Sequence, residues 1–260
     1  MICLTPRSRK KVEQEIDEKE PLVVTGSPPC TKFTVLMNLV MSKNISAEQR
    51  AKFHAELDKA IGHIRFCVKI YYKQIMAGRY FLHEHPAGAS SWELHEIIDL
   101  MSRVDVMEVI AHQCASGLTT TDVEDKSKQV PVKKPTRFIT NSWCIGESLD
   151  RKCQCQVPHG SLLGGRAAAA AIYPDKLCDA ICKGIANQIK QDMAHTVATR
   201  PMHAEGMVSF VNEINPGSLS RVMDHYTGHP DHWRDTFHEL DGTSVVDGKD
   251  VNGRRSCRWS

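Results

Sequence analysis

The feature that most constrains the fold is an alternation of short apolar segments with helical patterns between residues 21 and 142. The run Leu22-Val23-Val24 ends in Thr25-Gly26-Ser27-Pro28-Pro29, which predicts a buried strand followed by a rigid loop. Ser46, with Gln49 three residues later, predicts the start of a helix that continues to residue 76. Further strands are predicted at 79–83, 106–111 and 137–141, with a second helix over 92–101.

This order of elements is typical of an α/β fold, in which mostly parallel strands are covered by helices. We expect the strands near 22–25, 79–83 and 106–111 to be parallel and adjacent to one another. The strand at 137–141 is expected to run antiparallel beside them. The polar, charged stretch from Thr119 to Val130 is expected to be a loop.

The segments on either side of this core have a different character. Residues 1–20 are dominated by charge and are interpreted as a solvated lead-in, helical around Val12 to Ile16. Residues 143–195 form a helical extension, in which Pro174 suits the first position of a helix. Residues 196–260 are poor in apolar periodicity and are interpreted as a poorly ordered tail or linker.

Composition limits the cellular setting and the partners. The net charge of +2 provides no global field that would attract a nucleic acid, so such binding needs a local patch. The 10 cysteines are irregularly spaced in a chain too long to need disulfides, which favours a reducing compartment, nuclear or cytoplasmic. No apolar run approaches the roughly 18 residues that span a bilayer, so no membrane partner is expected.

The loop after the first strand presents Cys30 directly after two prolines that stiffen it. A thiol held at a strand end can act as a nucleophile once it loses its proton. The adjacent Lys32 and the N-terminus of a following helix are both expected to favour the thiolate. Taken alone, the same three residues also fit a small side chain in a Pro-rich turn.

Pro28-Pro29-Cys30 after an apolar strand, with Phe33 and Thr34 beyond, resembles the nucleophile loop of DNA cytosine-5 methyltransferases. In that family the next strand ends in Glu-Asn-Val, and its glutamate holds the N3 edge of the cytosine. Glu84 matches that glutamate here, whereas His85 and Pro86 replace the other two residues. The family's Gln-x-Arg-x-Arg motif is similar in position to residues 133–137, where Arg137 and, more weakly, Lys134 match.

The resemblance implies a partial Rossmann-like methyltransferase sheet over residues 21–142 and a catalytic half acting on a base flipped out of DNA. Cys30 would add to C6 of the cytosine, Glu84 would act as the acid at N3, and Arg137 would hold the base or its phosphate. The candidate substrate-binding residues are Ser27, Lys32 and Lys134. The alternatives are a solvated or histidine-paired carboxylate for Glu84 and a solvated loop face for the cations.

The family also has a Phe-x-Gly-x-Gly loop that contacts S-adenosylmethionine, and this sequence does not contain it. Because only residues 1–20 precede the first strand, we expect a truncated or inactive domain that does not bind the methyl donor alone. Its cofactor-binding residues are therefore unknown. Residues 26–141 also resemble a methyltransferase-like segment in retrotransposon-type polyproteins of dinoflagellate-like protists. The alternative function is a non-catalytic nucleic-acid-binding or structural module of such a polyprotein.

Cys153, Cys155 and His159 place three soft metal ligands within seven residues. Their spacing is not that of a Cys-x2-Cys knuckle. The sequence therefore favours ordinary free thiols over a zinc site at this position.

Overall fold

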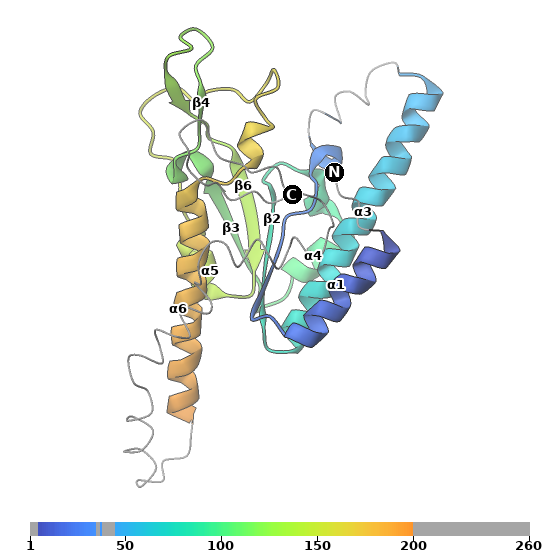
Figure 1. Ribbon diagram of the computed structural model, residues 1–260, viewed down its shortest axis with the longest axis vertical. Coiled ribbons are helices and arrows are strands. Elements are labelled where there is room, and N and C mark those ends of the chain that lie inside the picture. Colours follow the sequence, from blue (N-terminus) through green and yellow to red (C-terminus); the bar gives the residue numbers. More distant parts are fainter. Residues whose placement is uncertain (1–4, 35–36, 38–44, 200–260) are drawn as a thin grey trace.

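The computed structural model describes residues 5–34, 37 and 45–199, and its centre is a four-stranded sheet (Figure 1). The strands are β1 (Val23–Gly26), β2 (Tyr80–Pro86), β3 (Met107–His112) and β6 (Pro135–Thr140). β1 is parallel to β2, whereas β6 is antiparallel to both β2 and β3. The strands β1, β2 and β3 therefore run in one direction, as the sequence predicts.

The predicted adjacency of β2 and β3 is wrong, because β6 lies between them in the order β1-β2-β6-β3. Two of the three pairings are antiparallel, so the sheet is mixed and not mostly parallel. β6 suits an interior position because its successive residues Phe138 and Ile139, which point to opposite faces, are both fully buried. The structure thus establishes a mixed α/β fold, which is less specific than a Rossmann-like sheet.

One face of the sheet is covered by the long helix α3 (Ala47–Met76), which begins as predicted (Figure 1). The Ser46 hydroxyl accepts a hydrogen bond from the Gln49 N–H at 3.1 Å, and the Gln49 side chain accepts one from the Ser46 N–H at 3.0 Å. The predicted helix at 92–101 is split into a 3-10 turn η2 (Ser90–Glu93) and helix α4 (His95–Met101). The core of this layer is made of large apolar side chains: Phe33, Ile64, Val68, Tyr71, Phe81, Trp92, Ile97, Leu100 and Ile139.

The other face is covered by α5 (Trp143–Leu149) and α6 (Asp175–Thr199) (Figure 1). These two helices approach closely at Gly184, where an added Cβ would lie 2.6 Å from the Cα of Ile145. A side chain at this position would therefore force the helices apart. The core of this layer contains Leu82, Val109, Phe138, Ile145, Leu149, Tyr173, Leu177 and Ile181.

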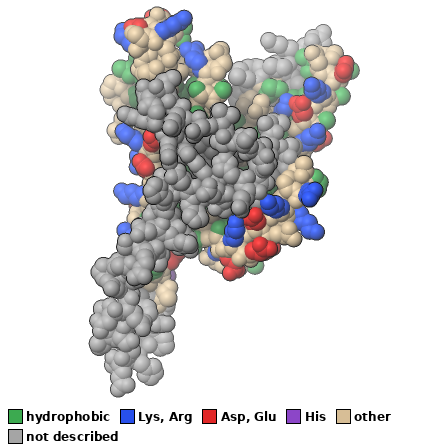
Figure 2. Space-filling view, viewed as in Figure 1, with side chains coloured by type: hydrophobic (Ala, Val, Ile, Leu, Met, Phe, Trp, Pro, Cys, Tyr) green, Lys and Arg blue, Asp and Glu red, His purple; other side chains and the backbone are tan. Residues whose placement is uncertain are grey.

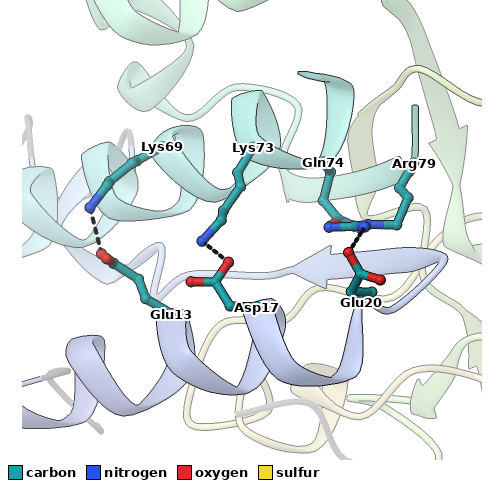
Figure 3. A network of polar contacts seen from close by, with 7 residues as sticks. All are labelled: Glu13, Asp17, Glu20, Lys69, Lys73, Gln74 and Arg79. Atoms are coloured by element: carbon teal, nitrogen blue, oxygen red, sulfur yellow. Dashed lines mark hydrogen bonds and ion pairs between the residues drawn. The ribbon is translucent and has the colours of Figure 1, made fainter. Parts of the chain in front are cut away.

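The charged lead-in forms helix α1 (Pro6–Lys19), which packs against α3 (Figures 1 and 3). Ile16 is buried in a small cluster with Phe66 and Ile70 of α3. Figure 3 shows three ion pairs along this contact: Glu13 with Lys69, Asp17 with Lys73, and Glu20 with Arg79. Exposed ion pairs contribute little, so the buried isoleucine is the main anchor of α1.

The stretch expected to be a loop at 119–130 contains a short antiparallel hairpin, β4 (Thr119–Thr121) and β5 (Gln129–Pro131). At the other end, α6 continues beyond the expected end of the helical extension at residue 195. Residues 200–260 of the expected tail lie outside the described residues. Within the described ranges, no helix is long and apolar enough to cross a membrane. Figure 2 shows basic and acidic side chains intermixed over the part of the visible face formed by α1 and α3.

Candidate active site at the end of strands β1 and β2

The loop that carries Cys30 follows β1 and leads into a 3-10 turn, η1 (Thr31–Phe33). Phe33 is buried and anchors the far end of the loop in the α3 layer. The near end is held by His85, whose Nε2 lies 2.9 Å from the carbonyl oxygen of Pro28. The loop is therefore fixed both by its prolines and by contacts on each side of Cys30.

His85 occupies the position at which the motif of cytosine-5 methyltransferases has asparagine, and here its ring makes two hydrogen bonds. Because a carbonyl oxygen can only accept, Nε2 of His85 must carry the hydrogen. Its Nδ1, 2.6 Å from Ser91 Oγ, then accepts from that hydroxyl. Burial lowers the pKa of His85, which keeps the ring neutral. His85 thus links β2, which carries Glu84, to the loop that carries Cys30.

Glu84 lies at the same end of the sheet as Cys30 and is buried. The hydroxyl of Ser27 donates a hydrogen bond to Oε2 of Glu84, which joins the beginning of the loop to β2. The hydroxyl of Tyr173 lies 3.5 Å from Ser27 Oγ and also interacts with Glu84. Ser27, Glu84 and Tyr173 thus form one polar cluster beside the cysteine.

The thiol of Cys30 is half-buried, and its pKa is raised by burial and, secondarily, by the negative charge of Glu84. Lys134 acts in the opposite direction on the same thiol. Burial in turn lowers the pKa of Lys134, against the attraction of Glu84 and Cys30. The expectation that the loop favours the thiolate is therefore wrong, since burial and a carboxylate outweigh the nearby cation.

Lys134 has an unusual backbone conformation and a fixed side chain. Its φ is 30°, in the left-handed region, although the residue carries a side chain and precedes a proline. Its Nζ donates a hydrogen bond to the carbonyl oxygen of Ala170 at 2.6 Å. Such strain of about 1–3 kcal/mol persists only where surrounding contacts fix it, and the charge of this amine interacts with Cys30 and Glu84.

Two other sequence candidates lie elsewhere. Lys32 forms an ion pair with Glu56 of α3, and its Nζ lies 5.5 Å from the ring centre of Phe53. Its ammonium group is therefore directed toward α3 and not toward the Cys30 cluster. Arg137 is paired in register with His85, one residue beyond Glu84, and therefore points to the opposite face of the sheet from Glu84.

On that face, the guanidinium of Arg137 lies 5.0 Å from the ring centre of Trp92, and Nε lies 3.5 Å from a carboxylate oxygen of Glu108. The structure therefore brings together Cys30, Glu84, Ser27 and Lys134, but neither Lys32 nor Arg137.

Sequence reasoning missed His85 and Tyr173 as parts of this site. His85 is visible in sequence only as a departure from the family motif. Tyr173 lies 146 residues from its Ser27 partner and adjoins the helix-starting Pro174, so nothing in the sequence signals their contact.

A second cluster joins the three soft ligands singled out in sequence to Cys114, which follows β3 in the 3-10 turn η3 (Gln113–Ser116). One ligand atom from each of Cys114, Cys153, Cys155 and His159 lies within 4.8 Å of all the others. The geometry of a possible Cys3His metal site is thus present, in contrast to the expectation of unrelated free thiols.

No protein-family description matches this sequence, and neither a curated protein nor a solved structure is significantly similar to it. The resemblance to cytosine-5 methyltransferases therefore depends on the residues and their placement alone.

Proposed function

We propose that this chain carries the cytosine-binding and thiol-adding half of a DNA cytosine-5 methyltransferase-like site. The observation that carries the proposal is the hydrogen bond from Ser27 to Glu84, which ties the Pro-Pro-Cys loop to the glutamate of the next strand. This contact supports the proposal because addition to a pyrimidine requires a nucleophile and an acid close together.

The proposed chemistry begins when Cys30 loses its proton to solvent and the thiolate adds to C6 of a flipped cytosine. Glu84 first takes up a proton from solvent. As the C6–S bond forms, the electrons of the C5–C6 double bond move into the ring, and N3 takes that proton from Glu84. In the absence of a methyl donor, C5 then takes a proton from water and releases its original hydrogen as a proton. Elimination of the thiolate returns the proton from N3 to Glu84 and restores cytosine.

S-adenosylmethionine, when bound, would supply the methyl group that C5 takes in place of that proton. The described residues do not fit a donor site of the family's kind, since no Phe-x-Gly-x-Gly sequence occurs in the chain. The proposed activity of this chain alone is therefore reversible thiol addition, and methyl transfer would need a donor site supplied from outside these residues.

The alternative of a non-catalytic module of a retroelement polyprotein is favoured by two observations. The pKa of Cys30 is raised by burial and by Glu84, which opposes formation of a nucleophile. Lys32 and Arg137, the cations proposed to hold the substrate, are already paired with Glu56 and Glu108.

Exchange of the C5 hydrogen separates the two functions without any methyl donor. The full chain would be incubated with duplex DNA containing cytosine tritiated at C5, and tritium released into water would be counted. We expect release by the wild type, none by Cys30→Ser, and a decrease of about 100-fold or more in Glu84→Gln, since a general acid contributes about 10²–10⁴-fold. Cys144→Ser, in helix α5 and outside the Cys30 cluster, is the matched control and should be unaffected.

No release by the wild type at any pH tested would reject the catalytic proposal. Retained DNA binding by fluorescence anisotropy in that case would favour the alternative. Calorimetry with S-adenosylmethionine should show no binding by this chain. Tight binding would show that the inference of an external donor site is wrong.

A further inference from the structure

We propose that Cys114, Cys153, Cys155 and His159 bind one zinc ion in a closed structural site. The inference is independent of the proposed catalytic function, because none of these four residues belongs to the Cys30 cluster. It rests on the donor set, on the distances between the donor atoms and on the way the chain around them is held.

The donor set suits zinc better than other common metals. Three cysteine thiolates and one imidazole form a frequent tetrahedral arrangement for zinc, whereas calcium and magnesium prefer oxygen ligands. Four protein ligands leave no open position for water or substrate, which is the mark of a structural site. Binding would release the protons of the three thiols.

The distances fit a single ion. With Zn–S bonds of about 2.3 Å, two sulfur atoms of a tetrahedral site lie about 3.8 Å apart. Here the Sγ of Cys153 lies 3.3 Å from Nε2 of His159, and all four ligand atoms lie within 4.8 Å of one another. Small side-chain movements would therefore complete the coordination.

The backbone around the cluster is positioned by contacts that do not involve a metal. The N–H of Cys153 donates a hydrogen bond to Nδ1 of His112 at 3.0 Å, and the N–H of His112 donates one to the carbonyl oxygen of Arg151 at 2.9 Å. These bonds dock the segment after α5 onto the end of β3, two residues before Cys114. Cys114 is buried, and its thiol lies within 4.8 Å of the ligand atoms of the other three residues.

A metal crosslink would also stabilise the irregular segment that carries Cys153, Cys155 and His159. Residues 150–168 contain neither helix nor strand and connect α5 to the 3-10 turn η4 (Ala169–Ala171). The apolar support beside them is a small cluster of Leu118, Val132, Ala170 and Leu162. No helix or strand holds this connection, so a bound metal would add to its stability.

The test uses the full chain purified under reducing conditions without chelator. Zinc content would be measured by inductively coupled plasma mass spectrometry, and cobalt would be added to the metal-free chain as a spectroscopic probe. We expect about one equivalent of metal, intense visible bands of tetrahedral cobalt and a thiolate-to-cobalt charge-transfer band. Thermal unfolding should shift to higher temperature on zinc addition, because the metal binds the folded state.

Cys153→Ser and His159→Asn should each lower zinc affinity by more than about 100-fold, since loss of even an outer partner costs about 10–100-fold. Cys144→Ser and Cys182→Ser, which lie outside the cluster, should retain wild-type affinity. Because His159 is exposed, its variant is expected to fold, and far-ultraviolet circular dichroism would check this.

The proposal would be overturned by a reduced wild-type chain that takes up neither zinc nor tetrahedral cobalt. It would also be overturned by equal affinity in the wild type and His159→Asn, or by a native disulfide that joins Cys114 to Cys153 or Cys155.

Discussion

Gly26→Ala tests whether the end of β1 must lie directly against α3. A Cβ added at Gly26 would lie 1.8 Å from the hydroxyl oxygen and 2.9 Å from Cζ of Tyr71. Tyr71 cannot simply move aside, because it is buried and its ring centre lies 4.6 Å from that of Phe81 in a stacked arrangement. Its hydroxyl oxygen also lies within hydrogen-bond distance, 2.9 Å, of Nδ1 of His83. The substitution must therefore displace β1 or break that buried hydrogen bond.

The expected cost combines two effects. Overpacking a well-packed core costs about 1–3 kcal/mol, and leaving a buried polar group without its partner costs about 1–3 kcal/mol. We expect Gly26→Ala to lower the free energy of unfolding by about 2–4 kcal/mol, in the lower part of the combined range, because partial movement of β1 and partial weakening of the Tyr71–His83 hydrogen bond share the relief of the clash. For a protein of this size the midpoint of thermal unfolding should decrease by about 5–15 °C.

Urea and thermal unfolding of the full chain would measure this loss, with Gly88→Ala as the matched control. Gly88 is exposed, and a Cβ there would meet nothing within 4 Å, so the control should change stability by less than about 0.5 kcal/mol.

A double mutant identifies the cause of the loss. Tyr71→Phe should destabilise the wild type, because Nδ1 of His83 loses its partner, but it should stabilise Gly26→Ala by removing the atom at 1.8 Å. Strictly additive losses in Gly26→Ala/Tyr71→Phe would refute the reasoning.

Three further predictions concern the thiol, the buried histidines and the first helix. Because the pKa of Cys30 is raised by burial and by Glu84 and lowered by Lys134, Glu84→Gln should speed alkylation of Cys30 by limiting iodoacetamide, and Lys134→Met should slow it. Peptide mapping by mass spectrometry would measure both rates, and the reverse order would contradict the electrostatic assignment. Burial holds the pKa values of His83 and His85 below the ordinary 6.5, so the unfolded chain gains protons first as pH falls. Their contribution to stability should be complete above about pH 6.5 and decrease below it, and equal free energies of unfolding in urea at about pH 8 and about pH 5.5 would contradict this. Ile16→Ala should lower the free energy of unfolding by about 2–4 kcal/mol, whereas Lys73→Met should lower it by less than about 1 kcal/mol, and similar losses in urea titrations would show that the ion pairs, not the apolar contact, hold α1.

The local signals in the sequence predicted most of the elements but not their order in the sheet. Ser46 and Gln49 marked the start of α3 because a capping box is a local interaction between neighbouring residues. The position of β6 between β2 and β3 depends on which strand can be buried on both faces, and this is decided by the helices of both layers. A sequence pattern that treats each strand by itself does not contain that information.

The same distinction applies to the candidate site. The resemblance named Cys30 and Glu84 from linear motifs, and the structure brings the loop after β1 and the end of β2 together. It also suggested Arg137, but the alternation of side chains along β6 sends that residue to the opposite face from Glu84. The direction of the pKa shift of Cys30 could not be predicted either, because the pKa of a thiol depends on burial and on charges from segments that are distant in sequence.

Lys134 connects the two sites of this molecule. Its carbonyl oxygen accepts a hydrogen bond from the N–H of Gln113, the residue before Cys114, and its amine donates to Ala170 at the end of the segment that carries the Cys3His cluster. The strained backbone of Lys134 is therefore held by Gln113 and Ala170, while its charge acts on Cys30 and Glu84. Because this amine opposes the two effects that raise the pKa of Cys30, the hydrogen bond from Lys134 to Ala170 bears on how readily the thiol can ionise.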